Sequence, residues 1–402
     1  MLNSQLSIVN CEFSIEPMTQ YAHITGWGMA VPERVMTNDE ISRLVDTNDE
    51  WIQSRTGIKE RRVADAKDTT SLLAAEAARQ ALEVADLAPE DIDLIIVATS
   101  TPDFTFPATA SLVQDALGAV RAGAFDLSAA CTGFIYALGV AADAIKSGSA
   151  KAALVIGAET MSRVLDWKDR GTCILFGDGA GAFVVQGSES PGGVLSVLLR
   201  SDGSGGDLLS LAGSGRPRAA GLAGFLDPTV QMNGREVFRF ATRVMVASTR
   251  EAVAAAGKTM ADISLIIPHQ ANRRIIEAAA RGLDLPEEKF MINLDRYGNT
   301  STASIPIALC EAVADGRLRP NDYVVFVGFG GGLTWGATTV HWDVTPLPAA
   351  ATRWHQVGRR TRYGLARVRS FGRRVLRKVE GAVFGSPTAK EDEPPKPPGS
   401  KK

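Results

Sequence analysis

The residue with the clearest potential for chemistry is a cysteine between a predicted strand and a predicted helix. Cys131 lies in DLSAACTGFIYALGVAADAIKSG, where the strand ends near Leu127 and the helix begins near Cys131. A thiol at a helix N-terminus meets the positive end of the helix dipole, which favours the nucleophilic thiolate. Small neighbouring residues permit a tight, strained turn and leave the sulfur accessible. The alternative is a buried cysteine in an apolar helix, which is how we interpret Cys173 and Cys310.

Two polar residues stand just beyond other predicted strands. His269 follows the strand in LIIPHQANRRII, and ligands of α/β sheets bind at the carboxyl ends of strands. Asn299 follows Gly298 in DRYGNTSTASIP, close to the position that Cys131 holds in an internal repeat. Taken alone, the histidine could be structural and the asparagine a turn or cap residue. Because Cys131, His269 and Asn299 all map to strand ends of related units, a functional role is favoured.

Three consecutive glycines, Gly330, Gly331 and Gly332, follow a further predicted strand. Without a following GK[ST] they do not form a phosphate-binding P-loop. They permit close backbone approach and can present N–H groups to an oxyanion, or they can simply form a tight turn. The GDGAGA run at 177–182 lacks the GxGxxG dinucleotide fingerprint in a strand–helix setting, so we interpret it as packing.

Strands and helices alternate along the segments that must position these residues. Short apolar runs next to glycine occur at 93–100, 151–159 and 323–330, as is typical of buried parallel strands. Helical patterns occupy 71–87 and 235–257. This alternation predicts an α/β fold in which helices cover the faces of the sheets.

An internal repeat divides the chain. Three pairs of segments recur in the same order, about 150–170 residues apart. The pairs are 90–100 with 261–271, 124–134 with 291–304, and 177–185 with 328–340. We infer two similar halves, 18–188 and 189–344, and expect the active site where they meet.

Composition excludes several classes of protein. A chain of 402 residues that is 45% hydrophobic and 22% charged is not collagen-like, disulfide-rich or wholly disordered. Its four scattered cysteines show no metal-ligand spacing, which favours free thiols in a reducing compartment. Residues 1–17 form an extension without the features of a secretory signal, and Met18 is an alternative start. Since no apolar run is long enough to span a bilayer, we expect a cytoplasmic protein.

The sequence resembles β-ketoacyl-acyl carrier protein synthase III, a condensing enzyme of the thiolase superfamily. The matching stretches run in family order over about residues 20–343. They are TNDEWIQSRTGIKERR (47–62), AACTGF (129–134), DRGTCILFGDGAGA (169–182), IPHQANRRII (267–276), YGNTSTAS (297–304) and GFGGGLTWG (328–336). The resemblance implies a thiolase-like fold with two βαβαβαββ halves in α-β-α-β-α layers, to which this chain adds a basic C-terminal extension.

The resemblance also implies a catalytic triad of Cys131, His269 and Asn299. It places an oxyanion hole at the backbone N–H groups of Cys131 and Gly331. The chemistry agrees, because a thiolate can take an acyl group from a thioester and form a covalent intermediate. Decarboxylation of a malonyl thioester then gives an enolate, which two donors at His269 and Asn299 would stabilise. No metal or organic redox cofactor is expected.

Further residues match substrate-binding positions of the family. Phe329 matches an active-site phenylalanine, and Phe106 matches the residue that crosses a dimer interface to line the acyl pocket. The positions that match coenzyme A contacts are Trp51, Arg55, Thr56, Arg170, Phe238, Asn272 and Arg274. The positions that match carrier-protein docking are Arg239, Arg274 and Arg281. Gly282 stands where some members have a second basic residue, which predicts a weaker docking patch.

These observations predict a homodimeric condensing enzyme that starts fatty acid chains. It would join a short acyl group, such as that of acetyl-coenzyme A, to malonyl-acyl carrier protein. A relative acting in polyketide, quinolone or long-chain ketone synthesis would keep the same triad and remains an alternative. An acyltransferase without condensation would not need both His269 and Asn299, and an intact triad argues against a non-enzymatic scaffold.

A basic tail lies outside the resemblance. Residues 345–402 hold 14 Lys and Arg against 4 Asp and Glu, whereas the whole chain has a net charge of −2. A linker is followed by a predicted basic amphipathic helix within 353–384, and the last residues have a disordered composition. We favour peripheral binding to an anionic membrane surface. An acidic protein partner, including the carrier protein or the acidic body, is the alternative, and nucleic acid is not expected.

Overall fold

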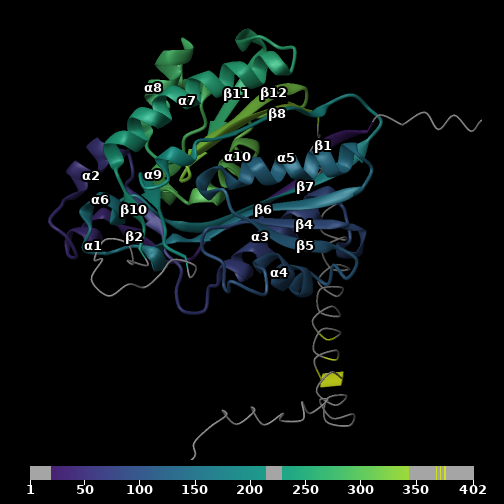
Figure 1. Ribbon diagram of the computed structural model, residues 1–402, viewed down its shortest axis with the longest axis horizontal. Helices are drawn as coiled ribbons and strands as arrows, with labels where there is room; N and C mark the ends of the chain where they lie inside the picture. The colour runs from purple at the N-terminus through teal and green to yellow at the C-terminus, as the bar shows by residue number, and fades with distance from the viewer. Residues whose placement is uncertain (1–19, 214–228, 344–367, 369–371, 373–374, 377–402) are drawn as a thin grey trace, which may run out of the picture.

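Five layers, alternately helical and sheet, make up the body of the molecule. The computed structural model describes residues 20–213 and 229–343 and positions 368, 372, 375 and 376. Figure 1 shows α7 and α8 over one sheet, α5 and α10 between the two sheets, and α3 and α4 beneath the other. The predicted α-β-α-β-α arrangement is therefore confirmed.

The first half contributes a five-stranded sheet in the order β1-β7-β6-β4-β5. Strands β6, β4 and β5 are parallel, and β7 pairs antiparallel with both β1 and β6. Every residue of β6 is buried, which explains its continuous apolar run. In chain order the elements are β1 (Tyr21–Ala30), α3 (Thr70–Ala85), β4 (Leu94–Ala98), α4 (Thr109–Leu117), β5 (Gly123–Leu127), α5 (Gly133–Lys146), β6 (Ala152–Thr160) and β7 (Asp178–Ser188).

The second half repeats this plan with a four-stranded sheet in the order β11-β12-β13-β8. Strands β11 and β12 are parallel, and β13 pairs antiparallel with β12 and β8. The division at residue 188 coincides with the end of β7. In chain order the elements are β8 (Gly193–Ser201), α7 (Gly234–Ala255), β11 (Ile263–Pro268), α8 (Arg273–Leu283), α10 (Ser304–Ala314), β12 (Asp322–Gly330) and β13 (Thr334–Trp342).

The repeat is imperfect where a strand equivalent to β5 was expected at the start of 291–304. A single parallel bridge between Ile266 and Phe290 stands there, and the chain continues into the short helix α9 (Leu294–Tyr297). The side chain of Gln270 explains the difference. Its amide donates to the carbonyl of Met291 at 3.0 Å and accepts from the N–H of Asn293 at 3.0 Å. These backbone groups are therefore satisfied without a longer strand.

The two halves interlock between the sheets. A Cβ at Gly157 of β6 would lie 2.3 Å from the carbonyl oxygen of Thr302 in the second half. A Cβ at Gly181 of β7 would lie 2.6 Å from the Cβ of Pro306 in α10. Glycine thus allows the first sheet to approach the segment that carries Asn299, and the packing interpretation of the GDGAGA run agrees with this contact.

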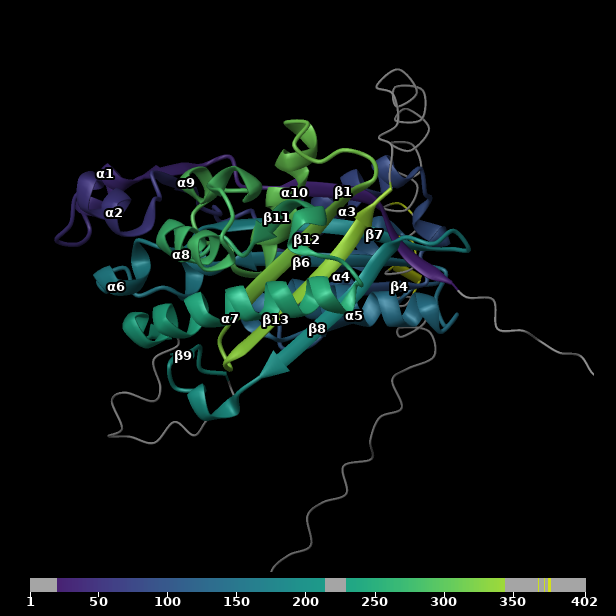
Figure 2. The ribbon, with the colours of Figure 1, turned by 90° about the horizontal axis from the view of Figure 1, so that it is seen from above.

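Smaller elements surround one end of the molecule, where α1, α2 and α6 lie in Figure 2. Arg61 is fully buried beneath them and donates to the side chain of Asn38 at 2.8 Å and the carbonyl of Ile174 at 2.7 Å. Burial lowers the pKa of Arg61 to about 10. These elements are β2 (Val35–Thr37), α1 (Asn38–Ser42), α2 (Asp49–Thr56), β3 (Glu60–Arg62), α6 (Arg170–Cys173), β9 (Leu209–Ser210) and β10 (Gln231–Met232).

Seven short 3₁₀ turns are described besides these elements. They are η1 (Pro89–Asp91), η2 (Ala130–Thr132), η3 (Met161–Val164), η4 (Gly203–Gly205), η5 (Met260–Asp262), η6 (Glu287–Lys289) and η7 (Ser301–Ala303).

Most of the two predicted terminal extensions falls outside the described residues. Residues 1–17 do so entirely. Within the predicted tail helix at 353–384, the described positions 368, 372, 375 and 376 are helical and exposed. Across the described parts of the chain, no helix has the length and apolar character to cross a membrane.

Candidate active site

Cys131 lies where β5 leads into the central helix α5. Ala130, which begins η2, has a φ of 46°, so the chain turns sharply just before the cysteine. The predicted strand–turn–helix setting is present, but the residue is only 8% exposed. Burial raises the pKa of Cys131 to about 12, and the negative charge of Glu159 acts in the same direction. The expected thiolate is therefore not the favoured state of this closed pocket, because desolvation outweighs the helix terminus.

A second left-handed residue marks the equivalent turn of the other half. Ser301 has a φ of 49° and begins η7, which leads into α10 just as η2 leads into α5. Counting from these two residues, the counterpart of Cys131 is Thr302. Asn299 lies three residues before this counterpart, close to it as expected, and both side chains line the same cavity.

His269 directly follows β11, at the strand end predicted for it. Its Nδ1 lies 2.7 Å from Oγ of Ser304, which also accepts from the N–H of Gln270 at 3.4 Å. The tautomer that leaves a donor on the other ring nitrogen is the one in which Nδ1 accepts the serine proton and Nε2 carries the imidazole proton. That nitrogen is buried without a hydrogen-bond partner among the described residues. Since burial lowers the pKa of His269 to about 3, the ring is neutral at physiological pH.

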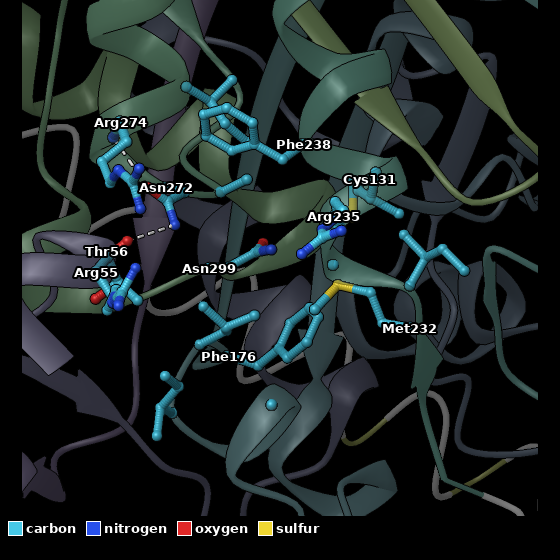
Figure 3. A pocket seen from close by; sticks show the side chains of 18 of the residues that line it. Arg55, Thr56, Cys131, Phe176, Met232, Arg235, Phe238, Asn272, Arg274 and Asn299 are labelled. Atoms are coloured by element: carbon cyan, nitrogen blue, oxygen red, sulfur yellow. Dashed lines mark hydrogen bonds between the residues drawn. The ribbon is translucent and has the colours of Figure 1, made fainter. Parts of the chain in front are cut away.

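Asn299 lies across the cavity from the cysteine. Its backbone N–H donates to the carbonyl of Leu175 at 2.8 Å, which ties it to the first half. Its Oδ1 accepts from the N–H of Ser301 at 2.8 Å. With Oδ1 held in this way, Nδ2 is the end of the amide that can serve the cavity. Figure 3 shows Asn299 in the middle of the pocket, with Cys131 beyond it.

The glycine turn after β12 closes against the cysteine. A Cβ at Gly330 would lie 2.7 Å from the backbone nitrogen of Cys131. A Cβ at Gly331 would lie 2.7 Å from the carbonyl oxygen of Leu209. Only a residue without a side chain fits at either position, so the turn brings backbone rather than side chains to Cys131. The ring of Phe329 stands edge-on to His269, with 5.4 Å between the ring centroids.

A cavity of about 540 Å³ joins these groups to the surface (Figure 3). At its mouth the guanidinium of Arg170 lies 4.7 Å from the ring centroid of Trp51, and that of Arg274 lies 5.6 Å from the ring of Phe238. The predicted site residues that line the cavity are Trp51, Arg55, Thr56, Cys131, Phe238, His269, Asn272, Arg274, Asn299 and Phe329.

Other predicted residues lie outside this cavity. Phe106 is 85% exposed on the surface of the single chain. Arg239 pairs with Glu236 at 3.2 Å on the exposed side of α7, and Arg281 is exposed on α8. Gly331 belongs to the glycine turn and does not line the cavity. Arg170 does not line it either, but its guanidinium stacks on Trp51, which does.

Sequence reasoning missed several residues of the site. Ser301 and Ser304 hold Asn299 and His269, and the run of hydroxyl residues in YGNTSTAS was their signal. Glu159 is fully buried and its charge acts on Cys131, and an acidic residue just before the end of an otherwise apolar strand could have indicated it. Arg235, in the first turn of α7, also lines the cavity (Figure 3).

This arrangement can hold a thioester at a cysteine while an imidazole N–H and an amide N–H face the same space. Such groups stabilise negative charge on a carbonyl oxygen. Together with the doubled five-layer fold, they define a condensing enzyme of the thiolase type, which is an acyltransferase. The chain belongs to the β-ketoacyl-[acyl-carrier-protein] synthase III family, and the recognition made from its motifs is confirmed.

Comparisons with known proteins support this assignment. Residues 125–203 match the family model described as 3-oxoacyl-[acyl-carrier-protein] synthase III, and residues 253–342 match the model of its C-terminal part. The β-ketoacyl-[acyl-carrier-protein] synthase III of Roseiflexus sp. (strain RS-1) is 52% identical over 81% of this chain and 99% of its own length.

Two solved structures show the same fold. The crystal structure of 3-oxoacyl-[acyl-carrier-protein] synthase III from Aquifex aeolicus VF5 is 48% identical, with a TM-score of 0.75 over 80% of this chain and 100% of that chain. The priming β-ketosynthase of the R1128 polyketide biosynthetic pathway is 37% identical, with a TM-score of 0.77 over 81% of this chain and 98% of that chain.

Proposed function

We propose that this protein is a 3-oxoacyl-[acyl-carrier-protein] synthase III that starts fatty acid chains. It transfers a short acyl group from acyl-coenzyme A to Cys131 and condenses that group with malonyl-acyl carrier protein. The observation that carries the proposal is the convergence of Cys131, His269 and Asn299 on one cavity with a mouth lined by arginine and tryptophan.

In the first half-reaction the sulfur of Cys131 attacks the thioester carbonyl. A bond forms between carbon and Sγ, the bond to the coenzyme A sulfur breaks, and coenzyme A leaves as a thiol. The backbone N–H groups of Cys131 and Gly331 are the proposed donors to the tetrahedral oxyanion, and the close approach of the glycine turn supports this role.

In the second half-reaction the malonyl thioester loses carbon dioxide and forms an enolate. Its oxygen gains negative charge, which the Nε2–H of His269 and the Nδ2 of Asn299 stabilise. Each such donor is worth about 3 kcal/mol in comparable sites. The enolate carbon then attacks the acyl-Cys131 carbonyl, which expels the Cys131 thiolate and gives 3-oxoacyl-acyl carrier protein, and the thiolate takes up a proton from water. Neither half-reaction involves net oxidation, so no redox cofactor is required, and the proposed N–H donors serve the carbonyl oxygens without a metal.

The mouth of the cavity is the proposed coenzyme A site. Trp51 offers an aromatic face against Arg170, and Arg55 and Arg274 supply positive charge for phosphate groups. Asn272 donates to the carbonyl of Arg55 at 3.0 Å and so joins the two sides of the mouth. Thr56 and Phe238 complete the proposed contacts.

The exposed face of α7 and α8 is the proposed docking site for the acidic carrier protein. Arg239, Arg274 and Arg281 supply its positive charge. Gly282 departs from family members that have a basic residue there. A Cβ at this position would lie 2.6 Å from a methyl group of Val246, so close packing of α8 on α7 supports glycine here.

A second copy of the chain is the proposed partner at β5, the edge strand of the first sheet. Phe104, Phe106 and Phe125 are 57%, 85% and 40% exposed near this edge. An unpaired strand edge beside exposed aromatic rings favours association. In such a dimer Phe106 would enter the acyl pocket of the neighbouring subunit, which Phe329 would also line. Light scattering that gives a monomer mass at micromolar concentration would contradict this.

Three further proposals concern the division of the chain, its location and its basic tail. The chain divides into halves at 18–188 and 189–344, flanked by the extension 1–17 and the tail 345–402. The enzyme is cytoplasmic, and the basic segment 353–384 attaches it peripherally to anionic membrane. Co-sedimentation of the full chain and a 1–345 truncation with anionic vesicles tests the attachment, which fails if both pellet equally weakly.

Mass spectrometry after incubation with a panel of acyl-coenzyme A species tests the main proposal. We expect an acyl adduct on Cys131 with short acyl groups and complete loss of condensation in Cys131→Ala. Full condensation by that variant would disprove the mechanism. Selective acylation by long or aromatic acyl groups would instead support a role in polyketide, quinolone or long-chain ketone synthesis, for which the likeness to the priming β-ketosynthase is the precedent.

A further inference from the structure

We propose that Thr334 is a positioning residue for the oxyanion hole, whose hydroxyl ties the glycine turn to the turn that carries Cys131. This role rests on the proposed function, in which the backbone N–H groups of Cys131 and Gly331 stabilise the tetrahedral oxyanion. Thr334 acts through the two turns rather than through contact with the substrate, and it fixes the two donors relative to each other.

The hydroxyl of Thr334 lies between the two turns that supply the proposed donors. Its Oγ1 is 3.1 Å from the carbonyl oxygen of Gly331 in the glycine turn. It is also 3.1 Å from the carbonyl oxygen of Ala129, the residue immediately before η2. Each of these carbonyls lies within two residues of a donor N–H, so a hydrogen bond from Thr334 restrains the donor beside it.

A second threonine hydroxyl completes this contact. Oγ1 of Thr132, which is fully buried at the end of η2, lies 3.0 Å from Oγ1 of Thr334. A hydroxyl can donate one hydrogen bond and accept others, and the carbonyl of Ala129 also accepts from the N–H of Thr132 at 3.2 Å. The arrangement that gives all these groups a partner is the one in which Thr132 donates to Thr334 and Thr334 donates to Gly331.

The glycine turn needs a restraint from outside. Residues 330–332 are all glycine, which has more backbone freedom than any other residue. A Cβ at Gly330 would lie 2.7 Å from the backbone nitrogen of Cys131, and a Cβ at Gly331 would lie 2.7 Å from a backbone carbonyl oxygen. Since side chains are excluded at both positions, the turn cannot be stiffened by its own residues, and the hydroxyl of Thr334 supplies the restraint.

The backbone that carries this hydroxyl is itself fixed on both sides. Thr334 begins β13 and pairs with Ser201 of β8 and with Gly330 of β12. The preceding residue, Leu333, exchanges two backbone hydrogen bonds of 2.8 Å with Asp202. A side chain on such a rigid element can hold its neighbours in a defined place, so Thr334 sets the two turns against the second sheet.

Loss of this restraint should affect only the steps that form an oxyanion in the hole. Acylation of Cys131 and the later attack on the acyl group both pass through a tetrahedral oxyanion there. Malonyl decarboxylation does not, because its enolate oxygen is served by His269 and Asn299. Alkylation by iodoacetamide does not either, since the sulfur attacks a saturated carbon. A general disturbance of the site would slow all of these reactions.

The experiment compares Thr334→Val and Thr334→Ser with wild type. Valine keeps the shape of threonine without the hydroxyl, whereas serine keeps the hydroxyl. With the acyl-coenzyme A that acylates wild type fastest, we expect Thr334→Val to be acylated about 10²-fold more slowly, as when a catalytic group is displaced. Its alkylation by iodoacetamide and its malonyl decarboxylation should keep their wild-type rates. Thr334→Ser should be acylated at close to the wild-type rate.

Thr338→Val is the matched control on the same strand. The Thr338 side chain is buried, and its Oγ1 has no hydrogen-bond partner among the described residues. Valine therefore removes the same group without breaking a contact, and this variant should be acylated at the wild-type rate. If Thr334→Val fails to fold, Thr334→Ser and Thr334→Ala, which differ only in the hydroxyl, provide the same comparison.

Acylation of Thr334→Val at the wild-type rate would overturn the proposal, and so would equal slowing of acylation, alkylation and decarboxylation. A Thr334→Ser variant as slow as Thr334→Val would overturn it as well, since the hydroxyl would not be the cause. The proposed function fails separately, if Cys131 of the wild type is alkylated but never acylated. Normal acylation of both wild type and Thr334→Val contradicts only the role of Thr334.

Discussion

The backbone N–H of Ser301 donates a 2.8 Å hydrogen bond to Oδ1 of Asn299. This contact decides which end of the amide serves the cavity, because an accepting oxygen held on the backbone leaves Nδ2 as the free donor. Ser304, three residues further on, holds His269 in a similar way, because its Oγ lies 2.7 Å from Nδ1 of the imidazole. The short segment from Asn299 to the first residue of α10 therefore holds both proposed enolate donors, Asn299 within the segment itself and His269 at the end of a neighbouring strand.

Ser304→Ala should impair the second half-reaction more than the first. Without the serine hydroxyl the imidazole loses the hydrogen-bond partner of Nδ1 that orients the ring, and a misdirected donor costs about 10²-fold in rate. We expect malonyl decarboxylation to fall by about this factor, while self-acylation falls less. The control is Ser248→Ala, a buried serine of α7 whose Oγ has no hydrogen-bond partner among the described residues. Equal losses in both half-reactions would contradict the assignment.

Gly330→Ala should damage acyl transfer severely. Its new Cβ would lie 2.7 Å from the backbone nitrogen of Cys131, so the glycine turn or η2 must shift. Because oxyanion donors act only at short range, we expect the acylation rate to fall about 10²-fold or more. The comparison is Gly203→Ala, where a Cβ meets no atom within 4 Å. Stopped-flow acylation of both variants checks this, and similar rates would show that the turn does not position the donors.

His269 should make the protein less stable in acid. Burial lowers the pKa of His269 from 6.5 to about 3, so between these values the unfolded chain binds a proton that the folded chain does not. The free energy of unfolding therefore falls as the pH drops from about 6.5 towards 3, and His269 contributes no such loss above that range. Urea titrations of wild type and His269→Gln across this range should converge as the pH falls. Parallel curves would contradict a buried neutral imidazole.

Trp51→Ala should weaken acyl-coenzyme A binding without blocking the condensation step. The guanidinium groups of Arg170 and Arg55 lie 4.7 and 5.9 Å from the centroid of its ring, so the indole holds both arginines at the mouth. We expect KM for acyl-coenzyme A to rise about tenfold, a loss of about 1.4 kcal/mol, with kcat nearly unchanged. Trp51→Phe keeps an aromatic face, so its KM for acyl-coenzyme A should lie between those of wild type and Trp51→Ala. A lower kcat with unchanged KM would place Trp51 elsewhere in the mechanism.

Much of the fold could be read from the sequence because its signals are local. The buried runs that became β4, β6 and β12, and the long helices α3 and α7, follow from apolar periodicity and neighbouring glycines. The internal repeat also predicted the pairing of the halves. It failed near 291, where the Gln270 side chain satisfies backbone groups that a strand would otherwise pair. A contact between residues twenty positions apart leaves no periodic signal.

The sequence by itself determined which residue types stand at the ends of which strands, and so placed Cys131, His269 and Asn299 in one site. Only the tertiary structure decided how deeply these side chains are buried and which protonation states are favoured. Packing of two sheets around α5 and α10 buries the thiol and the imidazole, raises the pKa of Cys131 and lowers that of His269. It also brings Glu159 from the first half to Ser301 of the second. Desolvation and such contacts depend on atoms distant in the chain, whereas helix and strand patterns depend on near neighbours.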